Sequence, residues 1–341
     1  MGLNKKTCNY GIYADLIQQY IAYKRSLGFK MEDTEKRFRR FDTLTLERKE
    51  SKIGISKELF DAWSNACPEE SACNRHERMG LLCGFSAYLQ HAGYDSHIPR
   101  MPKYNSTFTP YIYTKQELES IFNACDKLFL RGKYMYSPVC VMPALIRTLY
   151  ATGIRIGEAV KLKHGDVDLD TGYFVLHACK NGRDRVVPFS LSLREVLRDY
   201  VVYKQSMMTQ TAPDDFFFAS PDGKSCNRHT VYNLFRTVLF QAGISHGGKG
   251  KGPRLQDFRH TFCTNTLVGM SEAGQDLYHS MPVIMTYMGH QSIEATNRYV
   301  RLTAEMYPGL IGKVDEAYRY LFPEIGVDTE YKDNQAKSET P

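Results

Sequence analysis

The sequence of 341 residues lacks any long apolar run. Its most apolar window, residues 138–146, is far shorter than the ~20 residues that a membrane-spanning helix needs. The N-terminal segment contains lysines but no apolar stretch like that of a secretory signal peptide. The sequence therefore argues against a membrane or secreted protein, and we expect a soluble protein of the cytoplasm.

Cysteine is present without a pattern. The nine cysteines are scattered along the chain, which is typical of reduced thiols in a cytosolic protein. Cys67, Cys73 and His76 are close enough in sequence to suggest a metal site, but no second pair of ligands follows at the spacing of a zinc site. We therefore expect no bound metal.

The excess of basic over acidic side chains is also small. The chain has 44 Lys and Arg against 38 Asp and Glu, a net charge of +6. This balance permits a nucleic-acid partner without requiring one. Residues 324–341 are polar, with five acidic and two basic side chains, and we expect a disordered acidic tail there.

Residues 1–95 are expected to form a helical domain. Leu16, Ile17 and Tyr20 recur at helical spacing, and Ser56 is a suitable cap for a later helix. Asp33 or Thr34 is expected to cap a helix between them. The following segment, residues 96–113, has three prolines among polar residues and is predicted to be a linker.

Residues 114–323 mix helices with a few strands. Thr114 and Glu117 form a capping box that predicts the first helix, and Ser192 begins a second such box. Residues 173–179 and 185–189 are strand-like and are separated by an Asn-Gly turn. The expected fold is mainly α with a small antiparallel β-sheet.

Four segments of this second domain place polar side chains where a plain core would not need them. They carry Arg155, Lys180, Arg259, and finally His290 with Tyr299. Taken singly, each has a structural alternative. Arg155 could pair with an acidic residue one helical turn away, and Lys180 could be an exposed hairpin lysine.

The order and spacing of the whole set resemble those of the tyrosine recombinases, the phage integrase family. ATGIRIGEAVKLKHGDVDL (residues 151–169) resembles the first arginine box of that family, LQDFRHTFCTN (255–265) its second, and MGHQSIEATNRYV (288–300) its last. The resemblance extends from about residue 112 to residue 322. The N-terminal helical segment resembles, more loosely, the core-binding domain of the family.

The resemblance implies a role for each residue of the set. Tyr299 becomes the nucleophile, and Arg155 and Arg259 become the pair that clamps the scissile phosphate. Lys180 matches the lysine of the family's hairpin, and His290 matches the histidine of its Gly-His box. The fold implied is a helical core-binding domain followed by a mixed α/β catalytic domain.

Gln256 departs from the family pattern, which usually has histidine three residues before the second arginine. Glutamine can donate a hydrogen bond to phosphate, but it cannot exchange a proton at neutral pH. His260 follows Arg259 directly, and neighbours on a helix point about 100° apart. We therefore expect His260 to be structural rather than a replacement for the missing histidine.

The residue types suit the chemistry independently of the resemblance. A phenol that attacks a phosphodiester creates a highly charged phosphorane, and planar guanidinium groups bind such oxygens with paired hydrogen bonds. The 3′-phosphotyrosine product keeps the energy of the broken bond, so rejoining needs no ATP. The sequence has neither a phosphate-binding glycine loop of the P-loop type nor a carboxylate cluster for Mg²⁺. We expect no cofactor.

The sequence thus predicts a site-specific DNA recombinase that acts on double-stranded DNA as a homo-tetramer, with related recombinases or accessory factors as further candidate partners. We favour the integrase or transposase of a mobile element. The alternatives are a Xer-like resolvase of chromosome dimers and a DNA-binding accessory protein with impaired catalysis. Basic residues 36–40 and 246–254 are candidate contacts to the DNA backbone. A helix at 304–322 is expected to dock on a neighbouring protomer or to pack on its own domain.

Overall fold

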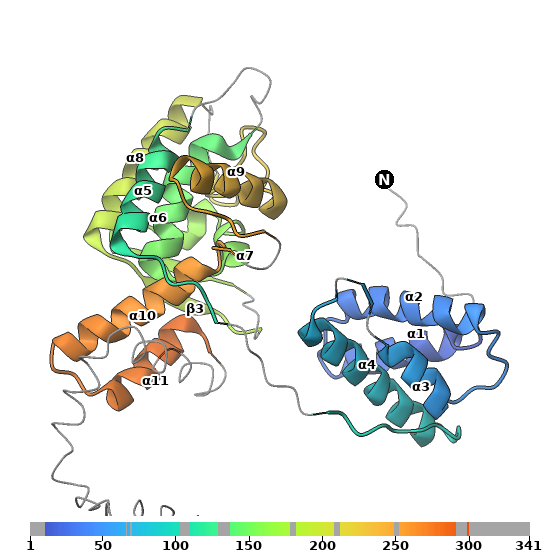
Figure 1. The fold of residues 1–341 in the computed structure, drawn as a ribbon. Helices are drawn as coiled ribbons and strands as arrows, with labels where there is room; N and C mark the ends of the chain where they lie inside the picture. The colour runs from blue at the N-terminus through green and yellow to red at the C-terminus, as the bar shows by residue number, and fades with distance from the viewer. Residues whose placement is uncertain are drawn as a thin grey trace, which may run out of the picture. The chain divides into compact units, whose positions relative to one another are not determined.

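The structure is a computed structural model. It describes residues 11–65, 67–68, 70–102, 109–128, 137–177, 182–207, 212–248, 252–290 and 299. Lys180, the helix expected at 304–322 and the acidic tail lie outside these residues. The chain divides between residues 108 and 109 into two compact units, which we call unit 1 and unit 2 and treat separately (Figure 1).

In the described part of unit 1, four helices, labelled in Figure 1, pack around an aromatic core. The helices are α1 (Ala14–Ser26), α2 (Glu32–Glu47), α3 (Lys57–Ser64) and α4 (Ala72–His91). Phe85 lies at the centre of the core, with its ring within 6.4 Å of the Tyr13, Phe38 and Phe41 rings. Burial of several large rings gives a small domain much of its stability.

Side-chain caps explain where two of these helices, α3 and α4, begin. The hydroxyl of Ser56 accepts a hydrogen bond from the amide of Leu59, as expected from the sequence. The expectation of a cap at Asp33 or Thr34 is wrong, because α2 begins earlier, after Met31. Met31 has a φ of 58°, so a left-handed backbone turn at this residue, rather than a capping side chain, precedes the helix.

Unit 2 joins a helical layer to a small sheet. Its helices are α5 (Lys115–Asp126), α6 (Met142–Thr152), α7 (Ile156–Ala159), α8 (Leu191–Met207), α9 (Arg228–Gln241), α10 (Asp257–Glu272) and α11 (Leu277–Met288), with short 3-10 turns at Pro138–Val141 and His164–Asp166. The capping box of Thr114 and Glu117 opens α5 as predicted. The cap expected at Ser192 is wrong. Helix α8 begins at Leu191, two residues earlier than a cap at Ser192 requires, and the hydroxyl of Ser190 accepts a hydrogen bond from the amide of Leu193.

The sheet of unit 2 has three antiparallel strands in the order β1 (Val167–Asp168), β2 (Tyr173–Leu176) and β3 (Arg185–Pro188). Leu176 pairs with Arg185 at the end of β2 and β3 from which the hairpin loop leaves. The arrangement confirms the predicted fold class, a mainly helical protein with a small antiparallel sheet.

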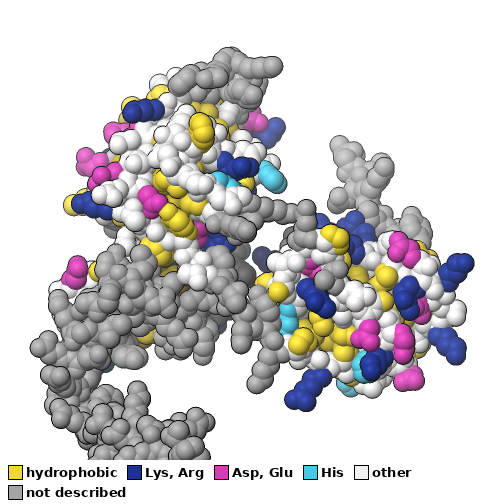
Figure 2. All heavy atoms as spheres, viewed as in Figure 1, with side chains coloured by type: hydrophobic (Ala, Val, Ile, Leu, Met, Phe, Trp, Pro, Cys, Tyr) yellow, Lys and Arg dark blue, Asp and Glu magenta, His cyan; other side chains and the backbone are white. Residues whose placement is uncertain are grey.

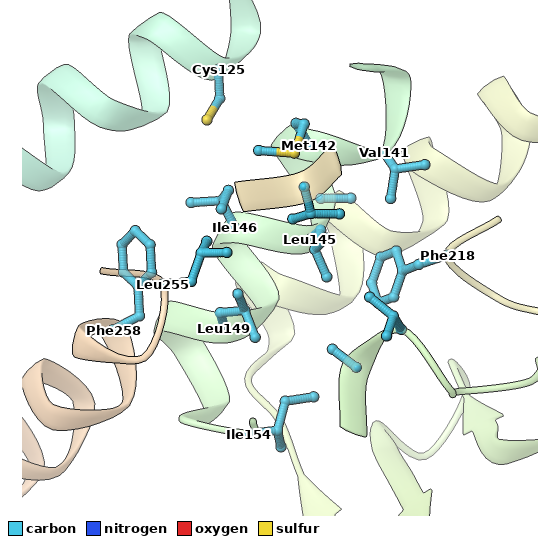
Figure 3. Close-up of a cluster of buried hydrophobic side chains, with 14 of the residues drawn as sticks. Cys125, Val141, Met142, Leu145, Ile146, Leu149, Ile154, Phe218, Leu255 and Phe258 are labelled. Carbon is cyan, nitrogen blue, oxygen red and sulfur yellow. The ribbon is translucent and has the colours of Figure 1, made fainter. Parts of the chain in front are cut away.

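Helix α6 is the centre of unit 2, because it packs against α5, α8, α9 and α10. Leu145, Ile146 and Leu149 of α6 are buried, and Figure 3 shows them grouped with Leu255, which precedes α10, and with Phe258 of its first turn. Since α6 ends just before Arg155 and α10 contains Arg259, this shared core fixes the two arginine segments against each other.

Candidate active site

The first arginine stands at a sharp change in chain direction. Helix α6 ends at Thr152 and is capped by Gly153, whose φ of 60° is left-handed, and Arg155 is the residue that precedes α7. Glu158 accepts hydrogen bonds from the backbone amide of Arg155, at 2.9 Å, and from its guanidinium, at 2.8 Å. Glu158 thus holds both the backbone and the guanidinium of Arg155, whose side chain remains 25% exposed.

Glu158 holds a second arginine that the sequence did not single out. Arg185 of β3 donates to both carboxylate oxygens of Glu158, at 3.2 and 2.8 Å. Burial by itself raises the pKa of the Glu158 carboxyl, but the hydrogen bonds and charges of Arg185 and Arg155 outweigh it and lower the pKa to about 2. A carboxylate that is ionised at neutral pH therefore links the first arginine to the sheet.

Arg259 is buried, and backbone carbonyls hold its guanidinium. One terminal nitrogen donates to the carbonyl of Gly153 at 2.8 Å, and the other donates to the carbonyl of Met288. These two bonds leave each nitrogen a second N–H with which to bind a phosphate oxygen. Burial and the nearby charge of Arg155 lower the pKa of Arg259 to about 10, so it stays cationic at neutral pH.

His290 follows the left-handed Gly289 directly after α11, and its amide donates to the carbonyl of Met285. Burial and the positive charges of Arg259 and Arg155 lower the pKa of its imidazole to about 4. His290 is therefore neutral at pH 7. A bound phosphate, with its negative charge, favours the protonated form of such an imidazole.

Tyr299 is 4% exposed and packs among Cys263, Leu267, Ile284 and Met288, apolar side chains of α10 and α11. Its ring is parallel to the ring of His290, with 5.8 Å between the centroids. The phenol oxygen is 2.8 Å from Nδ1 of His260. The structure therefore brings Tyr299, Arg259 and His290 together, with His260 beside them.

The contact between His260 and Tyr299 was not predicted from the sequence. The residue was expected to be structural because it faces away from Arg259 on the same helix. The angle between the two side chains does separate them, but it directs His260 to the phenol of Tyr299. The only sequence signal for this contact is the histidine next to the second arginine. Its partner, Tyr299, is 39 residues further along the chain, and only packing brings the two side chains together.

Gln256 lies immediately before α10, beside a cavity of about 290 Å³. The cavity is also lined by Arg228, Tyr232, His246 and Arg254. Lys180 lies outside the described residues, so its predicted role stays a prediction.

The metal site suggested by Cys67, Cys73 and His76 does not form in the part of the chain that the structure describes. The thiol of Cys67 instead accepts a hydrogen bond from Arg40, and Cys73 lies beside Glu77. Within the same residues, no helix is both long and apolar enough to cross a membrane.

Sequence comparison decides the family. The phage integrase family matches residues 112–306, which include all the predicted site residues. The protein y4rB of Sinorhizobium fredii, whose name classes it as an integrase/recombinase, is 30% identical over 86% of this chain and 94% of its own length. The chain belongs to the phage integrase family.

Other recombinases are similar to the chain at lower sequence identity. The tyrosine recombinase XerD of Listeria innocua is 27% identical over 65% of this chain and 69% of its own. Among solved structures, a lambda integrase dimer bound to a core site has a TM-score of 0.60 at 15% identity, over 83% of this chain and 93% of its own. The Tn1549 transposon integrase bound to transposon end DNA has a TM-score of 0.57 at 18% identity, over 85% and 98%. The prediction of a tyrosine recombinase is confirmed.

Proposed function

We propose that this member of the phage integrase family is a site-specific recombinase that cuts DNA with Tyr299 and rejoins it to a new partner strand. The observation that carries the proposal is the placement of the phenol in one buried cluster with Arg259 and His290. A buried tyrosine beside cationic and imidazole side chains suits nucleophilic attack on a phosphodiester.

In the proposed reaction, the Tyr299 oxygen attacks the scissile phosphorus as the bond to the 5′-oxygen breaks. Arg259 and Arg155 bind the non-bridging oxygens, where the negative charge grows. The phenol loses its proton, and the departing 5′-oxygen gains one, a step that the family resemblance gives to Lys180. Attack by a 5′-hydroxyl from the partner strand reverses each of these transfers and releases the tyrosine.

We propose the integrase or transposase of a mobile element as the biological role. The similarity to y4rB extends over nearly all of that protein, and a transposon integrase shares the fold. The XerD of Listeria monocytogenes matches over a similar length, 86% of this chain and 90% of its own, but at a lower identity of 26%, so a Xer-like resolvase stays the alternative. Inverted or direct repeats in the DNA beside the gene would support the mobile-element role, whereas recombination that requires a second, related recombinase would favour the Xer-like alternative.

The active assembly in this proposal is a tetramer on two DNA sites. A lambda integrase with the same fold, at a TM-score of 0.57, is described as a tetramer bound to a Holliday junction, and this supports the extension to our chain. Unit 1 would contribute contacts to the DNA backbone. Figure 2 shows lysine and arginine side chains on the visible face of this unit, with acidic ones among them. The proposed activity implies a cytoplasmic protein, since the DNA is there.

The experiment captures the covalent intermediate. Purified protein is incubated with a pool of nicked duplexes of random sequence. After cleavage, the nick lets the short strand beside the cleaved bond diffuse away, so the covalent intermediate cannot rejoin and accumulates. Protein–DNA adducts that survive boiling in detergent are digested with protease, and the attached DNA is sequenced. We expect one recurring sequence from the wild type and none from Tyr299→Phe, which lacks only the phenol oxygen.

DNA binding by Tyr299→Phe, measured by mobility shift on the recovered sequence, controls for folding. Adduct formation by this variant would remove Tyr299 from its role. Sequence-specific binding by a wild type that never forms an adduct would favour the accessory-protein alternative, which the glutamine at position 256 motivates.

A further inference from the structure

The phenol of Tyr299 has a specific hydrogen-bond partner in His260. Its oxygen lies 2.8 Å from Nδ1, a normal length for an O–H donor and a ring nitrogen acceptor. The two ring centroids are 5.5 Å apart. For the phenol to donate, Nδ1 must carry no hydrogen, so the neutral imidazole has its hydrogen on Nε2.

A carboxylate faces the other nitrogen of the same ring. Nε2 of His260 is 4.0 Å from Oδ1 of Asp257, whose side chain is only 1% exposed. Arg254 fixes that carboxylate, because its backbone amide donates to Oδ2 at 2.7 Å and its guanidinium donates to Oδ1 at 2.8 Å. A fixed negative charge on this side favours the tautomer with hydrogen on Nε2 and stabilises the imidazolium that forms when Nδ1 takes a proton.

Helix α10 directs two adjacent side chains, Arg259 and His260, to different partners. Arg259 turns toward the carbonyls of Gly153 and Met288, and His260, about 100° further around α10, turns toward Tyr299. His290 lies parallel to the phenol ring at 5.8 Å, whereas His260 reaches the oxygen itself. Gln256, where the family usually has histidine, cannot accept a proton at neutral pH.

We propose that His260 is a catalytic residue, the base that takes the Tyr299 proton as the tyrosine attacks DNA. This inference rests on the proposed function. The phenol O–H bond breaks, its proton goes to Nδ1, and the oxygen forms the bond to phosphorus while the bond to the 5′-oxygen breaks. In rejoining, the imidazolium returns the proton to the departing tyrosine oxygen, so His260 ends neutral.

Rates are measured in single-turnover cleavage of the nicked duplex recovered by covalent capture. We expect His260→Ala and His260→Asn each to form adduct at least about 100-fold more slowly than the wild type. Asparagine keeps a hydrogen-bonding group near the phenol but cannot take its proton. His279→Ala, which removes an exposed histidine of α11, serves as the matched control and should cleave at the wild-type rate.

A second substrate distinguishes a variant that lacks the general base from one that lacks the general acid. Replacing the bridging 5′-oxygen of the scissile bond by sulfur creates a leaving group that departs without a proton. His260 variants should remain slow on this substrate, because their defect lies in the nucleophile. A Lys180→Ala variant provides the contrast, since a general-acid defect should largely disappear with sulfur.

A third measurement makes the nucleophile more acidic. A ring-fluorinated tyrosine placed at position 299 alone loses its proton more readily, so it should recover much of the rate lost in His260→Asn while changing the wild-type rate far less. A merely structural effect of the substitution would not respond to the acidity of the phenol. Mobility shifts on the same duplex verify that each variant still binds DNA.

Three outcomes would overturn the inference: a wild-type rate in His260→Asn, rescue of that variant by the sulfur substrate, or no rescue by the acidic tyrosine. Each is distinct from failure of the proposed function, in which the wild type itself forms no Tyr299-dependent adduct.

Discussion

The guanidinium of Arg259 donates a hydrogen bond of 2.8 Å to the backbone carbonyl of Gly153. Gly153 caps α6 two residues before Arg155, so one bond joins the two arginine segments of the site across a separation of 106 residues. Because the acceptor is a main-chain atom, the distance between the arginines depends on backbone geometry at a single glycine. This relationship makes the site sensitive to changes that touch neither arginine.

Replacing Gly153 by alanine should therefore damage both stability and cleavage. The left-handed backbone costs alanine about 1–2 kcal/mol. A Cβ at this position would also lie 2.6 Å from the Phe262 ring and 3.2 Å from the sulfur of Met288. Relieving that overlap typically costs a further ~1–3 kcal/mol. Denaturant unfolding and single-turnover cleavage measure the two effects.

Gly274→Ala is the matched control for this prediction. Gly274 also has a left-handed φ, of 76°, but a Cβ there would meet nothing within 4 Å. Gly274→Ala should lose only the stability that the left-handed backbone costs alanine, about 1–2 kcal/mol, and should keep its cleavage rate. Equal losses in the two variants would mean that the Phe262 and Met288 contacts do not matter.

Arg259→Lys and Arg155→Lys should differ in stability although both cleave slowly. Each loses paired hydrogen bonding to phosphate, and we expect cleavage to fall by about 100-fold or more. Only Arg259 is buried and holds two carbonyls, so its replacement should also lower the free energy of unfolding by roughly 1–3 kcal/mol. Urea unfolding of both variants tests the contrast, and a similar loss in Arg155→Lys would contradict it.

The ion pairs of Glu158 should make stability depend on acid pH. Its pKa is about 2 in the folded protein, below the ordinary value of 4.5, so the folded state binds fewer protons. The stabilisation is present above about pH 4.5 and is lost as the pH falls toward 2. The shift corresponds to at most about 3 kcal/mol at 1.36 kcal/mol per pKa unit.

Comparison with Glu158→Gln isolates this contribution. The difference in free energy of unfolding between the wild type and this variant should be largest at pH 6 to 7 and shrink as the pH falls below 4.5. Urea titrations at several pH values measure it. A difference that is constant over this range would show that the carboxylate charge is not what Arg185 and Arg155 stabilise.

Gln256 should act through hydrogen bonding alone. Gln256→His should then cleave at nearly the wild-type rate, because His260 already provides a base beside the phenol. Gln256→Ala, with one donor to the charged phosphate lost, should be slower by about ten- to a hundredfold. Single-turnover cleavage of the three proteins distinguishes the cases. A Gln256→Ala variant as fast as the wild type would remove this residue from the site.

The sequence by itself determined the features that depend on neighbours along the chain. The capping box at Thr114 and Glu117 needs only four residues, and it opens α5 as predicted. The alternating strands around the hairpin pair as expected, because a two-residue period and a turn suffice to specify them. The arginine, histidine and tyrosine boxes were visible for the same reason, since each is a short local pattern.

The tertiary structure decided which side chains meet. His260 could not be assigned from its helix position, because its partner, Tyr299, is placed by apolar packing against α10 and α11. Arg185 gave no sequence signal as a partner of Glu158, since β3 reaches α7 only after the sheet and helices have packed. Periodicity gives the face on which a side chain lies, but a contact also requires the position of the second element. The core around α6 supplies that position, and local sequence does not encode it.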